Sequence, residues 1–204
     1  AASICSKYDV SPRDVYYQHL PELIDLMQLS GTTRRLDLNS DFFVDPKLPE
    51  ITELDLDWIP KAKLKGIVID DEDIELTEQW RHGSGLKKHV HNGYHFTLGV
   101  PKGSERAVEA RYEFTVPEDG EYEVRISHQP HENRSPNAPV VGYFSEGEKS
   151  FEINQSVAPP LSNSFYGLGV FTFKADTPGA VVVSTEGATG NVHLDAVQVV
   201  PVSN

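Results

Sequence analysis

The sequence is short of three things, and each shortage excludes a class of protein. Its 204 residues include one cysteine, so no disulfide can form within the chain. Lys and Arg number 18 against 31 Asp and Glu, and the net charge of -13 repels phosphate backbones and anionic lipid, so nucleic acid is not an expected partner. No apolar run approaches the roughly 20 residues of a membrane-spanning helix.

Catalytic and nucleotide-binding motifs are also missing from the sequence. It contains no Gly-x-Gly-x-x-Gly fingerprint and no Gly-x-Ser-x-Gly elbow, and Cys5 has no activating neighbours. We therefore expect this chain to be no enzyme by itself and to hold no dinucleotide. It shows no signal peptide, and its first residues resemble the inside of a helix, so we expect a piece of a longer protein.

Residues 1–65 are predicted to form a helical segment and a linker, the tail of an upstream domain. Ser11-Pro12 is typical of a helix start, and the apolar residues that follow from Leu20 to Met27 recur at helical spacing. This narrow apolar stripe needs a partner surface, which either the sandwich or a second copy of the chain could supply. Prolines break the rest of the segment, and Trp58 is expected to anchor it.

From residue 66 onward the apolar period becomes two, which is typical of strands. Strands are predicted over 66–69, 108–116, 122–127, 140–144, 151–153, 171–173, 180–184 and 192–200. Turn sequences such as Pro117-Glu118-Asp119-Gly120 separate them. Many short strands with such turns indicate an antiparallel sandwich or barrel over residues 66–204.

An ordered series of short motifs in this region resembles one known family. The residues that carry the resemblance are Ile69-Asp70-Asp71, Trp80, Gly93-Tyr94-His95, Gly120–Val124, Asn133–Pro139, Ile153-Asn154-Gln155, Leu168–Phe173 and Asp195-Ala196-Val197. Residues 66 to about 202 resemble the golvesin-type domain, which also occurs at the C-terminus of xanthan lyases. The resemblance implies a mainly β, jelly-roll (galactose-binding-like) sandwich. It also implies a non-catalytic, carbohydrate-binding-like accessory module of a larger secreted, periplasmic or cell-surface enzyme, with a polysaccharide or surface glycan as partner.

A second, shorter resemblance concerns the first 30 residues. Ala1–Cys5, Ser11-Pro12-Arg13 and Leu20–Leu29 are similar to the C-terminal end of secreted FAD-dependent oxidoreductases. That resemblance implies an upstream flavin domain, with FAD bound there and not in this chain. The sandwich would then be a structural or protein-docking domain.

The loop Asn133–Pro139 concentrates hydrogen-bonding groups between two predicted strands. Its polar side chains either bind a ligand or tie neighbouring loops together, and we favour the second role. Aromatic rings are the other candidates, because sugar faces stack on them; Trp80 and Tyr143 are expected in the core, and Phe165 and Tyr166 at the surface. The candidate ligand-binding residues are Asn133, Arg134, Asn137, His128, His131, Tyr94, Phe165 and Tyr166.

Acidic residues near the first and last strands raise the question of a metal. Asp195 has the strand parity of Val197, so its carboxylate faces the core and needs a partner. It either accepts hydrogen bonds from loop amides or Arg134, or it binds a structural Ca²⁺ together with Asp71 and Asp73. A Zn²⁺ site is a weaker alternative, and its candidate ligands are His82, His89, His91 and His95.

Overall fold

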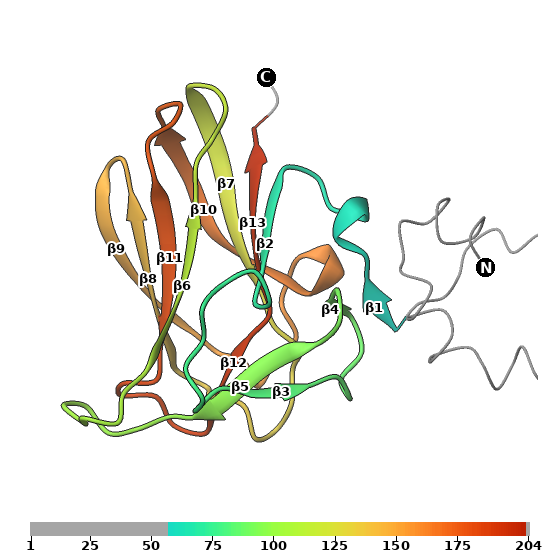
Figure 1. Ribbon diagram of the computed structural model, residues 1–204, viewed down its shortest axis with the longest axis vertical. Helices are drawn as coiled ribbons and strands as arrows, with labels where there is room; N and C mark the ends of the chain where they lie inside the picture. Colours follow the sequence, from blue (N-terminus) through green and yellow to red (C-terminus); the bar gives the residue numbers. More distant parts are fainter. Residues whose placement is uncertain (1–56, 203–204) are drawn as a thin grey trace, which may run out of the picture. The chain divides into compact units, whose positions relative to one another are not determined.

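A computed structural model describes residues 57–202, and the predicted helix at residues 11–30 lies outside them. Two four-stranded antiparallel sheets face each other (Figure 1). The first contains, in spatial order, β10 (Phe165–Phe173), β7 (Gly120–Ser127), β13 (Ala196–Pro201) and β2 (Ile67–Asp70). The second contains β6 (Glu109–Phe114), β11 (Gly179–Ser184), β8 (Ala138–Phe144) and β9 (Gly147–Ile153). The predicted mainly β sandwich is confirmed.

Smaller elements lie around these two sheets. A third sheet, at the lower end of the sandwich in Figure 1, contains β12 (Asn191–Leu194), β5 (Tyr94–Leu98) and β3 (Arg81–Gly83). A parallel pair joins β1 (Trp58–Ile59) to β4 (His89–Val90). Two short 3-10 helices complete the described chain, η1 (Lys61–Lys63) and η2 (Ser162–Ser164).

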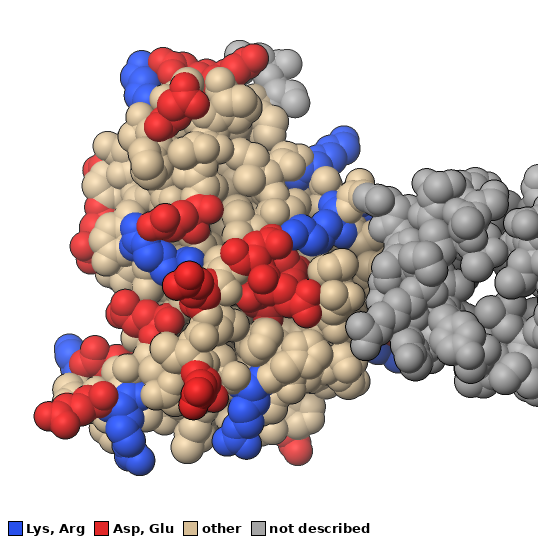
Figure 2. Space-filling view, viewed as in Figure 1, with Lys and Arg blue, Asp and Glu red and all other residues tan. Residues whose placement is uncertain are grey.

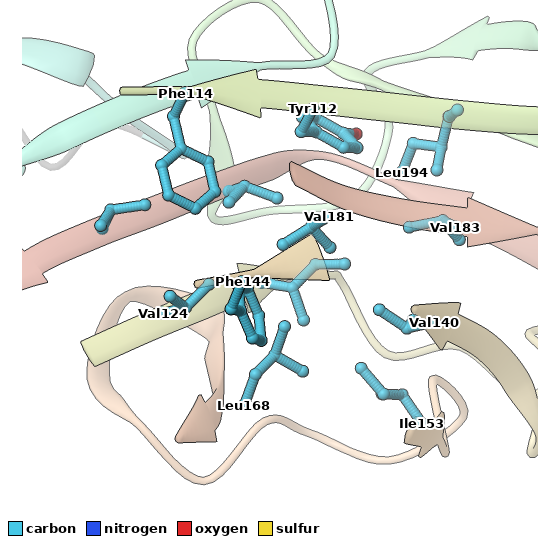
Figure 3. Packing of buried hydrophobic residues seen from close by; sticks show 14 of the residues in the cluster. Tyr112, Phe114, Val124, Val140, Phe144, Ile153, Leu168, Val181, Val183 and Leu194 are labelled. Atoms are coloured by element: carbon cyan, nitrogen blue, oxygen red, sulfur yellow. The ribbon is translucent and has the colours of Figure 1, made fainter. Parts of the chain in front are cut away.

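The main core lies between the two large sheets and follows from the alternation in their strands. In β6 the buried positions are Ala110, Tyr112 and Phe114, while the residues between them are exposed. Figure 3 shows Phe144 and Leu168 from opposite sheets close together, with Val181 above them. Burial of apolar side chains of this size contributes roughly 1.5–3 kcal/mol each.

The last predicted strand, over residues 192–200, is divided in two by the structure. It breaks at Asp195: β12 belongs to the third sheet, and β13 belongs to the first. The chain therefore passes from one sheet to another at a buried carboxylate. Since β2 ends beside β13 at Asp70, with Asp70 opposite Ala196, this crossing brings acidic residues from both ends of the domain together.

Candidate functional site

Three buried carboxylates meet where β2 ends and where the chain crosses between β12 and β13. Asp70 is the last residue of β2, Asp71 follows it, and Asp195 lies at the crossing. Their exposed fractions are 0%, 1% and 0%, and one ligand atom from each lies within 4.8 Å of the others. We call Asp70, Asp71 and Asp195 the carboxylate cluster. At this separation and an effective dielectric of about 20, two carboxylates repel by about 3 kcal/mol.

Asp195 is held by three donors that come from two segments, β4 and the end of β7 with the loop after it. Its Oδ1 accepts the backbone N–H of Val90 at 2.9 Å. Its Oδ2 accepts the Ser127 hydroxyl at 2.5 Å and the side-chain amide of Gln129 at 2.7 Å. The sequence prediction that Asp195 takes hydrogen bonds from loop groups is therefore right for amides and wrong for Arg134, which lies on aromatic rings instead.

The other two carboxylates are incompletely satisfied. Asp71 Oδ2 lies 2.6 Å from Nδ1 of His95, and Asp70 Oδ1 accepts the N–H of Glu72 at 3.2 Å. The remaining oxygens, Asp70 Oδ2 and Asp71 Oδ1, are buried without any hydrogen-bond partner. A buried carboxylate oxygen without a donor is costly unless a proton or a cation accompanies it.

The electrostatics of the cluster agree with its geometry. Burial raises the pKa of Asp195 to about 7. Burial, reinforced by Asp195, raises the pKa of Asp70 to about 7. Burial and the neighbouring Asp70 raise the pKa of Asp71 to about 10. Three hard oxygen donors with this tendency to bind positive charge match the ligand chemistry of Ca²⁺.

Asp73 does not join the cluster, which corrects the predicted ligand set of Asp71, Asp73 and Asp195. A turn closed by the Asp73 N–H and the Asp70 carbonyl directs the Asp73 carboxylate back onto the Asp70 N–H at 2.8 Å. That carboxylate also pairs with Lys61 and is 44% exposed. Asp70 takes its place in the cluster. Strand alternation alone does not predict that Asp70 and Asp71 both face the cluster, because they lie at the end of β2, where the regular pleat stops.

The histidines do not support a zinc site. His89 is buried in β4, whereas His91 lies in a left-handed turn with φ of 56°. The rings of His82 and His95 pack edge to face at 5.3 Å, and His95 is engaged with Asp71. Within residues 57–202, the carboxylate cluster is the one group of at least three metal-ligating side chains at suitable spacing.

A pocket of about 380 Å³ opens beside the carboxylate cluster, and three loops form it. We call it the loop pocket. Its lining residues are Leu86, Lys87, Lys88, Gln129, Pro130, Ala158, Pro159, Leu161, Ser162 and Ser164. The first three of these residues precede β4, Gln129 and Pro130 lie between β7 and β8, and the other five lie between β9 and β10. The β9–β10 connection includes η2, which is the orange turn beside β4 in Figure 1.

The walls of the loop pocket are tied to the rest of the domain. Gln129 donates to the Lys88 carbonyl at 3.1 Å and to Asp195, and its Oε1 lies 2.8 Å from His193 Nε2. The Ser164 carbonyl accepts the N–H of His128 at 3.2 Å. Lys88 and Ser164 both have left-handed backbones, with φ of 66° and 62°. Left-handed non-glycine residues are uncommon, and two of those in the described chain line this pocket.

The loop Asn133–Pro139, the main ligand candidate in the sequence, lies away from this pocket and is largely engaged with the protein. Asn137 donates to the Gly187 carbonyl at 3.0 Å and accepts the Thr189 N–H at 2.9 Å. The backbone carbonyl of Asn133 accepts the Asn191 N–H at 2.9 Å. Its side-chain oxygen lies 2.8 Å from Nδ1 of the exposed His131. These contacts tie the loop to the β11–β12 connection.

Two aromatic expectations are wrong. Phe165 is 1% exposed, whereas it was expected at the surface, and Tyr143 is 40% exposed, whereas it was expected in the core. Tyr166 is partly buried and packs against the main core. Trp80 is buried as expected, and Tyr94 is buried beneath the Arg134 guanidinium. Buried rings of this kind offer no face for a sugar.

None of the eight sequence-predicted ligand candidates is among the described residues that line the loop pocket. Two of them contact the lining: the His128 N–H donates to the Ser164 carbonyl, and the Phe165 carbonyl accepts the N–H of Leu161. The buried ring of His128 lies 3.1 Å from the Val157 carbonyl. Sequence reasoning missed Lys88, Gln129 and Asp70. Gln129 carried one usable signal, because it stands two residues after the end of β7 and directly before a proline, where a polar loop begins.

Comparisons with known proteins agree with the sandwich. The family described as the Golvesin C-terminal domain matches residues 67–201. A Paenibacillus xanthan lyase structure is similar at 25% identity and a TM-score of 0.54, covering 67% of this chain and 13% of the lyase. No curated protein matches the sequence. Among the described residues, no helix is long and apolar enough to cross a membrane.

Two solved carbohydrate-binding modules are also similar in fold. A family 35 module from Clostridium thermocellum matches at 12% identity and a TM-score of 0.42, covering 66% of this chain and 98% of the module. A module from Cellvibrio mixtus lichenase 5A, solved with cellotriose, matches at 11% identity and a TM-score of 0.42, covering 67% of this chain and 98% of the module.

Proposed function

Because the chain belongs to the Golvesin C-terminal domain family, we propose that it is a non-catalytic carbohydrate-binding accessory domain whose glycan site is the loop pocket. The observation that carries this proposal is the pocket itself. Apolar walls from residues such as Leu161 and Pro159 suit the C–H faces of a sugar, and the hydroxyls of Ser162 and Ser164 suit its oxygens. Its walls are tied to the core, so little ordering is needed on binding.

The similar xanthan lyase supports a glycan ligand, since its name gives a polysaccharide as substrate. This chain covers 13% of that enzyme, which supports a role as one module of a larger secreted, periplasmic or cell-surface protein. A tethered module raises the local concentration of its ligand, so even millimolar affinity, about -4 kcal/mol, assists an attached catalytic domain.

Filling the pocket tests this function. Ala158 lies exposed in the pocket wall, so Ala158→Trp fills the pocket without disturbing the core. We expect the variant to lose about tenfold or more in glycan affinity, measured by calorimetry and affinity electrophoresis against neutral and acidic polysaccharides.

Leu98→Trp is the matched control, because Leu98 is 59% exposed in β5 and does not line the pocket. It should melt at the wild-type temperature and bind normally. If the wild-type domain binds no polysaccharide at millimolar concentration, glycan binding is wrong. If the two Trp variants bind equally, the ligand lies elsewhere.

We also propose that the carboxylate cluster holds a structural Ca²⁺. The observation that favours it is the pair of buried oxygens, on Asp70 and Asp71, that have no hydrogen-bond partner. The cation would neutralise a cluster that is otherwise repulsive, and carboxylate oxygens from both ends of the domain would bind it. The remaining ligands of a six- to eight-coordinate ion would come from water or backbone carbonyls.

Asp70→Asn tests this second proposal, because its expected effect on stability relative to the wild type differs between Ca²⁺-free and Ca²⁺-containing solution. Without Ca²⁺ the variant should be at least as stable as the wild type, because it removes one of three buried acidic groups that disfavour one another's ionisation. With Ca²⁺ at 100 times its Kd the wild type should gain about 2.7 kcal/mol, and the variant should not. Thermal melting in EDTA and in Ca²⁺ measures both effects.

Asp73→Asn is the control, because its carboxylate pairs with Lys61 outside the cluster. It should keep the Ca²⁺-dependent rise in melting temperature. Equal melting of the wild type in EDTA and in Ca²⁺ would exclude the cation site. Loss of the rise in Asp73→Asn with retention in Asp70→Asn would restore the ligand set expected from the sequence.

The flavoprotein alternative depends on residues 1–30, which lie outside the described part of the chain. In that case the sandwich is a structural or protein-docking domain at the end of an FAD-dependent oxidoreductase. The coding sequence upstream of Ala1 tests it: a Gly-x-Gly-x-x-Gly motif after a predicted strand supports the alternative. A lyase or protease domain there excludes it.

A further inference from the structure

The charges that line the loop pocket have one sign. Among the described residues that line it, Lys87 and Lys88 are the charged ones, and none is Asp or Glu. This differs from the chain as a whole, in which 31 acidic residues outnumber 18 basic ones. Figure 2 shows Asp and Glu spread over one face of the domain with fewer Lys and Arg among them.

Lys88 is positioned more firmly than an ordinary surface lysine. Its N–H donates to the Asp57 carbonyl, and its carbonyl accepts the Gln129 amide at 3.1 Å. Its left-handed backbone, with φ of 66°, sets the direction in which the side chain leaves. Within residues 57–202 its ammonium makes no ion pair, so it is available to a ligand.

Lys87 is the weaker of the two cations. It pairs with Asp57 at 2.7 Å, but the two side chains are 74% and 66% exposed. Ion pairs this exposed are weak and exchange readily with other partners. The availability of a cation to an incoming anion therefore rests on Lys88.

The net charge of -13 does not cancel this local preference. At physiological ionic strength charges are screened over about 8 Å, so a ligand within the pocket responds mainly to the lysines that line it. Distant acidic groups slow the approach of an anionic polymer more than they weaken its final contact.

We propose that the loop pocket selects a carboxylate-bearing sugar, such as a uronic acid unit, over a neutral one. The inference rests on the proposed glycan function and adds the ligand class. Lys88 would pair with the sugar carboxylate, while Ser162 and Ser164 would bind hydroxyls. Both N–H groups of the Gln129 amide are engaged, with Lys88 and Asp195, so Gln129 is a positioning residue.

The test compares a uronic-acid oligosaccharide with the same oligosaccharide after its carboxyl groups have been reduced to alcohols. We expect calorimetry to show about tenfold tighter binding of the acidic form, and the difference should shrink at high salt. Lys88→Gln should lose most of this difference. Lys102→Gln removes the same charge from an exposed residue outside the pocket and should bind as the wild type does.

Each outcome decides a different question. Equal or tighter binding of the reduced oligosaccharide overturns the charge inference and leaves glycan binding intact. An acidic preference that persists in Lys88→Gln also overturns it, since another group then recognises the carboxylate. Failure of both oligosaccharides to bind overturns the proposed function and this inference with it.

Discussion

At the scale of single residues, Arg134 is a buried cation whose guanidinium packs against two aromatic rings. It is 5% exposed, and its guanidinium lies 4.8 Å from the ring centre of Phe96 and 5.4 Å from that of Tyr94. The guanidinium donates to Asn133 Oδ1 in a long hydrogen bond of 3.4 Å. Burial lowers the pKa of Arg134 from its usual value. The residue therefore supports the loop by packing, and its charge is not offered to a ligand.

Arg134→Ala should therefore lower the stability of the domain and leave its glycan affinity nearly unchanged. Loss of the ring contacts and of the buried stem should cost about 2–3 kcal/mol of unfolding free energy, measured with urea. Arg134→Met, which keeps the stem, should lose less. Glycan affinity should stay within about twofold wherever the variant is folded. A stable Arg134→Ala domain that has lost glycan binding would instead make Arg134 a ligand clamp.

Some residue environments were predictable from the sequence and others were not. Strand alternation correctly placed Asp195 inside the domain. It failed at Tyr143, because β8 is apolar on both faces and gives no alternating signal. The surface prediction for Phe165 had another basis, because the sequence of residues 163–167 is typical of a polar loop. In the structure Phe165 begins β10, and a register shift between Gly167 and Gly169 turns the start of this strand toward the other face.

At the scale of elements, the β7–β8 and β11–β12 connections behave as one unit. Asn137 joins them through the Gly187 carbonyl and through the N–H and hydroxyl of Thr189. Gly190 lies close to this contact, because a Cβ on it would come within 3.1 Å of the Asn133 carbonyl oxygen. The motif that identifies the family in the sequence therefore ties loops together.

Asn137→Ala should release the two connections from each other. Because it leaves the Gly187 carbonyl and Thr189 N–H without their partners, we expect a loss of about 1–3 kcal/mol in unfolding free energy. Hydrogen exchange should quicken at the Thr189 amide. Asn154→Ala is the matched control, since Asn154 bonds only to Ser156 in its own loop. Equal losses in the two variants would argue against this coupling.

At the scale of the whole domain, the first sheet carries a second apolar cluster on its outer face. Val90, Phe165 and Ala196 are buried there, and Leu64 and Val68 pack against them. Part of the cover thus comes from the segment before β2. The domain boundary at residue 65 remains a sequence prediction. This packing favours a sandwich domain that starts before Trp58, because the Trp58 side chain is also buried, at 6% exposed.

Two shortened chains test where the domain starts. A chain that begins at Leu56 should fold and melt near the temperature of the full chain. One that begins at Gly66 loses Trp58 and Leu64 and exposes apolar surface, so it should melt several degrees lower and bind a hydrophobic dye. Equal melting of the two shortened chains would show that the segment before Gly66 contributes no stability.

The sequence by itself determined the sandwich class, most strand positions and the family, because alternation and turn chemistry are local properties of the chain. Only the tertiary structure decided the sites. Asp70 and Asp195 stand near opposite ends of the domain sequence, and the pairing of β2 with β13 brings them together. The loop pocket likewise takes its walls from three separate connections. Strand pairing is a long-range property, and no local pattern encodes which loops it places side by side.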